Sequence, residues 1–417
     1  MSVVSLFWIA VCAVLAPLIA GLIPRRLVPE VVLLLIGGVL IGPNALGLAA
    51  TDEAIDLLHE LGLGMLFLLA GYEIQLKDLT GRGGRRALVV WLICLTAAFA
   101  IVGLIGLTGA IRAEVPLAIA LTSTALGTLL PILKDAGLLG TRFGGAIVNH
   151  GAIGELGPVV AMAILLGARG ALASIIVLAA FALIAVLVSL PPRRIAAGSK
   201  ILSLIRAGAE TTGQTTVRLT VLLLVGLLVL ANVFELDSVL GAFAAGFILR
   251  RALPSGNEIL ESKLEGLAFG WLIPIFFVTS GMAIDPAAVA AAPLALIIFV
   301  LLILLVRGVP VWLSTRLERD LVTGEPMFSS RDSLRIGLYS ATGLPIIVAV
   351  TTVAVDAAEM SPTSASVLVA GGAITVLLLP MTATLLARPG QDGTGATSTH
   401  QAPRTVHEGG RRQNGQT

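Results

Sequence analysis

The sequence predicts an all-α polytopic membrane protein of about 13 transmembrane helices, arranged as two inverted six-helix repeats with broken crossing helices. Three observations predict this fold class: an apolar composition, recurring apolar segments, and motifs that return in the second half of the chain. Of the 417 residues, 57% are hydrophobic and 12% charged, whereas soluble proteins carry about 25% charged residues. The mean hydropathy is +1.00. No cluster of basic and aromatic residues indicates a nucleic acid, so the lipid bilayer is the expected environment.

Each predicted span is a run of about 20 predominantly apolar residues, the length that crosses the hydrocarbon core. The first apolar run lacks a basic segment before it, which favours a retained span over a cleaved signal peptide. The segment 391–417 is rich in Gly, Thr and Gln, and we expect a disordered cytoplasmic tail there. The predicted spans are 4–24, 28–48, 54–74, 87–110, 114–133, 143–167, 171–190, 216–234, 237–250, 265–284, 294–314, 333–355 and 364–387.

The placement of basic residues predicts the orientation of these spans. If the N-terminus lies outside, 24 of the 27 Lys and Arg residues fall in cytoplasmic loops or in the tail. Positively charged loops stay on the cytoplasmic side. We therefore expect a multi-pass protein of the bacterial plasma (inner) membrane, with its N-terminus outside and its C-terminus in the cytoplasm.

Three segments recur in the same order in the two halves, which predicts an internal repeat. The second unit begins on the opposite side of the membrane, so the repeat is inverted, as is common in secondary transporters. The predicted transmembrane domain, 1–390, comprises repeat one (about 4–167), a connector (171–190) and repeat two (about 216–387). The paired segments are LFLLAGYEI (66–74) with FFVTSGMAI (276–284), GGVLIGP (37–43) with GAFAAGF (241–247), and TSTALGTLLPI (122–132) with YSATGLPIIVA (339–349).

The fifth and twelfth predicted spans contain helix-breaking residues at matching positions. Proline has no N–H, so Pro131 frees the Gly127 carbonyl and Pro345 frees the Ala341 carbonyl. Paired interrupted spans are a pointer to a transport site, although a proline kink with Ser and Thr bonding back to the helix is the simpler alternative. The residues predicted at the crossing are Gly127, Pro131, Ser340, Ala341 and Thr342.

Only two formal charges, Glu155 and Arg307, fall near the centre of a predicted span. A central charge costs at least about 2.5–3.5 kcal/mol and usually marks an ion or proton pathway. A purely structural ion pair between them is the alternative. Pro158 frees the Gly154 carbonyl beside Glu155, and Gly151 leaves room for a neighbouring backbone. Glu73 lies at a span end, from which it can reach the interface.

Five motifs in order resemble the sodium/proton exchanger superfamily, specifically the monovalent cation:proton antiporter-2 (Kef-like) branch. The resemblance covers roughly residues 5–387 and implies the sodium/proton antiporter fold, a homodimer and transport by alternating access. The motifs are VPEVVLLLIGGVLIGPNALGL, LGMLFLLAGYEIQLKDL, ALTSTALGTLLPILKDAGLLGTRFG, LGAFAAGFIL and IPIFFVTSGMAID.

The resemblance also implies roles for individual residues. Glu155 stands where the family has its essential carboxylate, and Thr124 matches a threonine whose backbone faces the ion. Gly154 and Ala125 stand where relatives can have a further acidic residue. Arg307 matches the basic residue of a late helix and is the expected charge partner. The expected proton- and cation-binding set is Glu155, Thr124, Ser123, Gly154 and Ala125, with Glu155 and Thr124 holding Na⁺ or K⁺.

These features predict secondary active antiport of a monovalent cation against protons, with Glu155 binding one or the other. With one central acid and an arginine that stays charged, we expect electroneutral 1:1 exchange. A cation channel and an organic-anion transporter on a similar scaffold are the alternatives; Arg307 could bind a carboxylate in the latter. No enzyme activity and no cofactor are expected.

Overall fold

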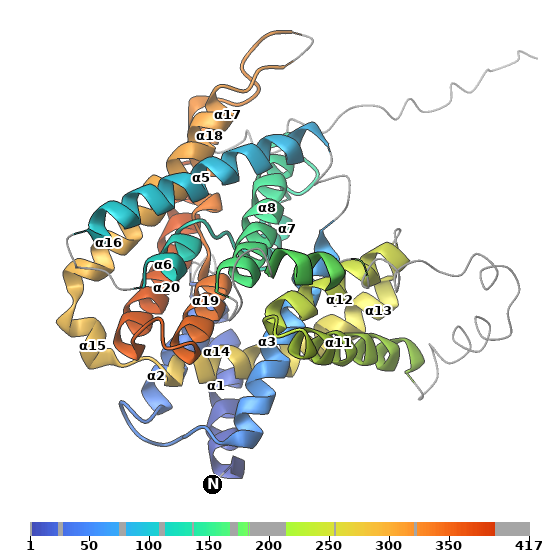
Figure 1. Cartoon of the computed structure of the whole chain (residues 1–417), viewed down its shortest axis with the longest axis vertical. Coiled ribbons are helices and arrows are strands. Elements are labelled where there is room, and N and C mark those ends of the chain that lie inside the picture. The colour runs from blue at the N-terminus through green and yellow to red at the C-terminus, as the bar shows by residue number, and fades with distance from the viewer. Residues whose placement is uncertain are drawn as a thin grey trace, which may run out of the picture.

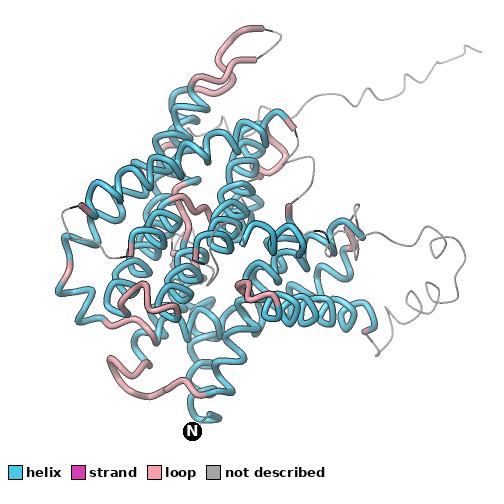
Figure 2. Tube along the Cα trace, viewed as in Figure 1, coloured by secondary structure: helices cyan, strands magenta, loops and turns pink. Residues whose placement is uncertain are grey.

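The computed structural model describes residues 2–23, 28–74, 81–107, 113–135, 137–166, 174–181, 183, 214–253, 256–320 and 323–387. The described part is helical throughout, apart from turns, loops and one isolated β-bridge between Arg319 and Pro326. Figure 1 and Figure 2 show helices packed side by side, without a sheet. Most of the predicted connector (171–190) and the whole of the predicted tail (391–417) lie outside the described residues.

The helices of the first half correspond to the first six predicted spans. They are α1 (Ser2–Leu22), α2 (Glu30–Ile41), α3 (Glu53–Glu73), α5 (Arg82–Gly106), α6 (Glu114–Leu121), α7 (Leu126–Asp135) and α8 (Arg142–Leu165).

The helices of the second half correspond to the last six predicted spans. They are α11 (Thr215–Val233), α12 (Ser238–Ala252), α13 (Glu258–Leu267), η2 (Ala268–Leu272), α14 (Ile273–Met282), α15 (Pro286–Ala291), α16 (Pro293–Ile303), η3 (Leu304–Gly308), α17 (Val309–Arg316), α18 (Ser330–Ser340), α19 (Leu344–Asp356) and α20 (Pro362–Leu385).

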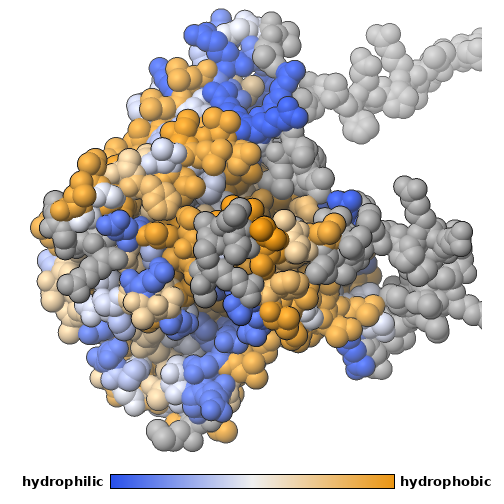
Figure 3. Space-filling view, viewed as in Figure 1, coloured by the Kyte–Doolittle hydropathy of each residue, from blue (hydrophilic) through white to orange (hydrophobic). Residues whose placement is uncertain are grey.

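The lengths of these helices confirm the polytopic all-α class. Within the described residues, nine helical segments are long and apolar enough to cross a membrane, and two shorter apolar helices accompany them. Figure 3 shows the apolar side chains that cover much of the visible face. The protein is therefore a multi-pass membrane protein.

Two spans differ from their predicted bounds for local reasons. The second span ends at Ile41 rather than near 48, because Gly42 is extended (ψ 170°) before Pro43, and a residue preceding proline avoids the helical region. The tenth begins at Glu258 rather than near 265, because Asn257 caps the helix and accepts a hydrogen bond from the Leu260 amide at 3.0 Å. The first turns of this helix are polar, so the run of apolar residues begins later than the helix does.

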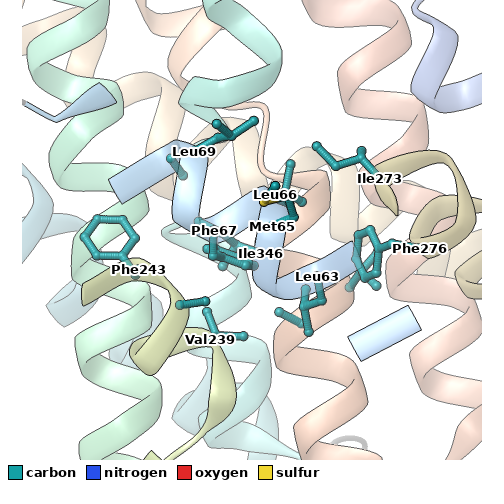
Figure 4. Close-up of a cluster of buried hydrophobic side chains, with 14 of the residues drawn as sticks. Leu63, Met65, Leu66, Phe67, Leu69, Val239, Phe243, Ile273, Phe276 and Ile346 are labelled. Atoms are coloured by element: carbon teal, nitrogen blue, oxygen red, sulfur yellow. The ribbon is translucent and has the colours of Figure 1, made fainter. Parts of the chain in front are cut away.

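The helices form two bundles, which we call the first bundle and the second bundle. The first bundle contains α1–α3 and α11–α14, and the second contains α5–α8 and α15–α20. In the first bundle, α2 packs along α14 and α3 packs along α12. An apolar cluster joins the bundles: Ile346 of α19 belongs to the same cluster as Phe67 of α3 and Phe243 of α12 (Figure 4).

The two close helix pairs of the first bundle have matching packing, as related repeats should. A Cβ on Gly38 would meet the Val278 carbonyl, and one on Gly246 would meet the Leu68 carbonyl. In the same way, a Cβ on a glycine of α14 would meet the Leu35 carbonyl, and a Cβ on a glycine of α3 would meet the Phe243 carbonyl. These contacts make Gly38 equivalent to Gly246, one helical turn away from the register predicted by matching 37–43 with 241–247. The register between the two repeats is set by the glycines at which backbones approach closely, and not by the similarity of the two sequences.

Replacing Gly246 by valine should destabilise the first bundle. A Cβ there would lie 2.7 Å from the Tyr72 amide nitrogen, in a tight backbone contact that cannot yield. Overpacking of this kind costs about 1–3 kcal/mol or more, so the unfolding midpoint in detergent should fall. Gly226→Val is the matched control, because no atom of another described residue outside its own helix backbone lies within 4 Å of a Cβ at Gly226 on α11. Equal midpoints for the two variants would contradict this account.

Candidate ion-binding site

Two interrupted helices cross in the middle of the second bundle. Residues 122–125 separate α6 from α7, and residues 341–343 separate α18 from α19. The two breaks bond to each other, because the Ala125 amide donates to the Thr342 carbonyl and the Thr124 hydroxyl donates to the Ser340 carbonyl. The predicted pair of broken spans is thus confirmed, and polar backbone at membrane depth is satisfied within the protein.

The first break lies earlier in the chain than the position of its proline predicts. Thr122 and Ser123 donate their hydroxyls back to the carbonyls of Ile119 and Ala120, at 2.8 and 2.7 Å, and so terminate α6. Gly127 and Pro131 lie inside α7 rather than in the break.

The second break also differs in the role of its proline. Pro345 stands in the first turn of α19, where a missing N–H costs nothing. Ala341 and Thr342 form the break as predicted, and Ser340 is the last residue of α18.

Glu155 lies in the middle of α8, and only 3% of its surface is exposed. The backbone N–H groups of Leu126 and Gly127, at the start of α7, hydrogen-bond to its carboxyl group. A helix N-terminus carries a partial positive charge and favours an anion. The Oε2 atom of Glu155 is buried, and no described residue forms a hydrogen bond with it. The broken helix thus presents its positive end to a carboxylate that keeps one oxygen available.

Gly154 serves as a point of close approach. The Thr124 amide donates to the Gly154 carbonyl at 2.8 Å, so the carbonyl that Pro158 was expected to leave free already has one partner. A Cβ on Gly154 would lie 2.7 Å from the Cβ of Thr124. Any side chain at position 154 would therefore push the break away from α8. Gly151 makes room for a side chain rather than for the neighbouring backbone that was predicted, since a Cβ there would lie 2.8 Å from the Leu126 side chain.

Arg307 is fully buried in the π-helical segment η3. Its Nε donates to the Thr124 hydroxyl at 3.0 Å, and its Nη2 donates to the His150 carbonyl at 2.6 Å. Nη1 lies 3.9 Å from the Cys94 sulfur. Within the described residues no ion pair joins Arg307 to Glu155, so the direct structural pair considered from the sequence is not formed. The guanidinium instead fixes Thr124, which holds the break against both α8 and α18.

A cavity of about 490 Å³, here called the Glu73 cavity, lies between the two bundles. Leu126 and Asn149 line it from the second bundle, and charged side chains of the first bundle line the opposite wall. The cavity therefore reaches the residue whose amide bonds to Glu155. The charged lining residues are Glu73, Arg250, Glu261 and Glu265.

A smaller cavity of about 210 Å³, here called the Asp237 cavity, also lies between the bundles. Met162 of α8 and Leu166, which directly follows α8, line it together with Val353 and the turn between α11 and α12. Along α8, Asn149 precedes Glu155 and Met162 follows it. Along α8, Glu155 thus lies between the residues that line one cavity and those that line the other.

Glu73 is a functional candidate that the sequence analysis placed at the interface. Its Oε2 atom is buried and has no hydrogen-bond partner among the described residues, and a negative charge on Glu73 would repel one on Glu155. A helical pattern could have indicated this: Leu69, Tyr72 and Glu73 share one face of α3, and all three line the cavity.

The other predicted site residues gather around the same crossing. Ser123 and Ala125 are buried beside Thr124, and Ser123 also lies 3.5 Å from the Gly343 carbonyl oxygen. His150 is buried, and its Nδ1 atom has no hydrogen-bond partner in the part of the chain that the structure describes. Among the residues described, no cluster of three or more His, Cys, Asp or Glu side chains is arranged to hold a metal ion. A monovalent cation would rely on Glu155 and oxygen atoms at the crossing.

The chain is similar to known ion exchangers. The family described as "Sodium/hydrogen exchanger, transmembrane" matches residues 10–388. The Arabidopsis thaliana protein "Cation/H(+) antiporter 17" is 27% identical over 323 residues, which are 70% of this chain and 38% of that protein. The Klebsiella pneumoniae protein "Glutathione-regulated potassium-efflux system protein KefC" is 28% identical over 299 residues, 68% of this chain and 45% of that protein. The chain thus spans less than half the length of both.

One curated relative and one solved structure match over most of their length. The Bacillus cereus protein "Probable Na(+)/H(+) antiporter GerT" is 25% identical over 339 residues, 79% of this chain and 86% of that protein. The structure of the sodium proton antiporter MjNhaP1 from Methanocaldococcus jannaschii at pH 8 matches with a TM-score of 0.58 and 17% identity. That match covers 92% of this chain and 97% of the other, and it confirms the predicted antiporter fold.

Proposed function

Because this chain belongs to the sodium/hydrogen exchanger family, we propose that it exchanges a monovalent cation, Na⁺ or K⁺, for protons across the membrane. The observation that carries the proposal is the position of Glu155. It is a buried carboxylate that accepts hydrogen bonds from the amides of Leu126 and Gly127 and lies between two cavities. Such intramembrane carboxylates mark ion and proton pathways.

In the proposed mechanism Glu155 holds either a proton or a cation. The amides at the start of α7 stabilise the ionised carboxylate, and a cation completes its coordination with oxygens near Thr124 and Gly154. Protonation removes the charge that holds the cation, so the cation leaves. One site thereby couples the two ions by competition, and each cycle moves one proton against one cation.

Access to Glu155 alternates between the Glu73 cavity and the Asp237 cavity. Both cavities are lined by both bundles, so a movement of one bundle against the other can open one while it closes the other. This supports alternating access. We further propose a homodimer, which the family resemblance implies, in the bacterial plasma membrane with the N-terminus outside. The distribution of Lys and Arg residues supports that orientation.

Arg307 argues against the organic-anion alternative. Its described hydrogen bonds hold the crossing together, and it is not among the residues that line either cavity. An anionic substrate would have to displace these hydrogen bonds to reach the guanidinium.

Exchange should be electroneutral in proteoliposomes. Addition of Na⁺ or K⁺ should dissipate a preset pH gradient, because cation binding to Glu155 releases a proton. Clamping the membrane potential at zero should leave the rate unchanged, since one charge moves in each direction. An exchange rate that changes at least twofold under the clamp would contradict the 1:1 stoichiometry. Failure of both cations to dissipate the gradient would contradict the proposed function.

A further inference from the structure

The start of α5 carries exposed arginines that the exchange at Glu155 does not require. Arg82 and Arg85 lie at this start, and both are exposed. In the described part of the chain, neither side chain forms a hydrogen bond or an ion pair. An arginine without an acidic partner offers a permanent positive charge and a fork of N–H donors to a ligand beside it.

A third arginine lies at the same end of the second bundle. The Nε atom of Arg86 donates to the Ser314 hydroxyl at 2.8 Å, which holds the start of α5 beside the end of α17. Arg316, the last residue of α17, is exposed, and its side chain has no such contact among the described residues. Figure 3 shows hydrophilic side chains gathered around the start of α5 and the connection from α17 to α18. We call the surface made by Arg82, Arg85 and Arg316 the basic edge.

The acidic residues of the connection from α17 to α18 leave the basic edge positive. Glu318 forms an ion pair with Arg86 at 3.5 Å, and Asp320 forms one with Arg142 at 3.0 Å. Both carboxylates are therefore held by arginines outside the basic edge. Glu325 is the third acidic residue of this connection, and one carboxylate cannot neutralise three guanidinium groups. The remaining positive charge is available to an anion from outside the chain.

Next to these arginines, the same face of α5 is apolar and exposed. Val89 lies one turn after Arg85, and Leu92 lies a further turn along the helix, so the three residues share a face. The side chains of Val89 and Leu92 are 57% and 48% exposed. Because they belong to a helix long and apolar enough to cross the membrane, they face lipid chains. Arginines at the interface beside an apolar strip match the headgroup and the acyl chains of a phospholipid.

We propose that the basic edge binds the phosphate of an anionic phospholipid in the cytoplasmic leaflet, while the acyl chains lie along the exposed face of α5. Guanidinium groups bind phosphate through paired, charge-assisted hydrogen bonds, and basic surfaces at the cytoplasmic ends of membrane helices attract anionic lipids. The choice of leaflet rests on the proposed orientation, whereas the binding itself does not depend on the proposed exchange. The lipid stabilises the protein, because it binds the folded arrangement of α5 and α17 and not the unfolded chain.

Arg251 shows what distinguishes the basic edge from other basic residues at the membrane interface. Arg251 is exposed at the end of α12, on the same side of the membrane in the proposed orientation. The apolar residues just before it, Ile248 and Leu249, are buried, so no lipid-facing strip adjoins it. Arg251→Gln is therefore the matched control, since it removes an exposed arginine from a surface that lacks a place for acyl chains.

The test titrates the detergent-solubilised protein with phosphatidylglycerol and follows the thermal unfolding midpoint. The midpoint of the wild type should rise and then saturate, whereas phosphatidylcholine should leave it unchanged. In Arg85→Gln the phosphatidylglycerol concentration at the half-maximal rise should increase about fivefold, the contribution of one arginine near an anionic surface. In the triple variant Arg82→Gln/Arg85→Gln/Arg316→Gln it should increase at least about tenfold. Arg251→Gln should stay within about twofold of wild type.

Native mass spectrometry provides a second measurement that does not depend on stability. The wild type should retain more phosphatidylglycerol molecules per protein than the triple variant does. Equal half-maximal concentrations in the wild type and the triple variant, or equal numbers of retained lipids, would overturn the proposal. A rise of the midpoint with inorganic phosphate in place of the lipid would show a site for a free anion and would overturn the lipid assignment.

Discussion

Glu155→Gln should reduce cation/proton exchange to the level of protein-free liposomes. Glutamine has nearly the same shape as glutamate, and its carbonyl oxygen can still accept hydrogen bonds from the Leu126 and Gly127 amides. The amide cannot ionise, so it can neither release a proton nor attract a cation. The measurement is dissipation of a preset pH gradient by Na⁺ or K⁺ in proteoliposomes.

The matched control is Glu60→Gln, which changes an exposed glutamate on α3. It should exchange at the wild-type rate. The unfolding midpoint of Glu155→Gln should be close to that of wild type, because the substitution removes a charge without creating a cavity. Exchange that persists in Glu155→Gln at more than a few per cent of the wild-type rate would remove Glu155 from the mechanism.

Among the substitutions at the crossing, Arg307→Ala should cause the largest loss of protein stability, together with loss of exchange. The substitution leaves the Thr124 hydroxyl and the His150 carbonyl without their buried donor and opens a cavity between η3 and α8. One unsatisfied buried group costs about 1–3 kcal/mol, so we expect a destabilisation of at least about 2 kcal/mol. The unfolding midpoint in detergent measures the stability, and proteoliposome exchange measures the activity.

Arg307→Lys separates the charge of the guanidinium from its geometry. Lysine keeps the positive charge, but its single ammonium group cannot reproduce the fork that donates to Thr124 and His150. We expect stability and exchange between those of wild type and Arg307→Ala. Arg251→Ala, at an exposed position at the end of α12, is the control and should behave as wild type. Full activity in Arg307→Lys would show that charge alone suffices.

The sequence predicted Glu155 and Arg307 because charge within an apolar run is a local property. A central charge in a span is costly wherever the helix packs, so composition alone identifies it. The contacts that Arg307 makes were not predictable in the same way. Arg307 is 183 positions from Thr124 and 157 from His150, and only the packing of η3 against the crossing shows that it contacts these groups rather than Glu155.

Glu73, in contrast, is a candidate functional residue that the sequence did not predict. At the end of a span, a glutamate can reach the interface by extending its side chain, and the sequence does not show that Glu73 instead lines a cavity together with residues of α13. The same limit applies to Pro131 and Gly154. Whether a proline breaks a helix, and whether a freed carbonyl stays free, depends on the neighbours that satisfy the backbone.

The sequence by itself determined the helical membrane class, the positions of the spans, the pair of interrupted helices and the central carboxylate. These follow from hydrophobicity, charge and proline chemistry, which act over one or two helical turns. The tertiary structure alone decided what the carboxylate contacts, which are the amides of Leu126 and Gly127 at the start of the broken helix. Such contacts join residues far apart in the chain, so they arise only when the helices pack.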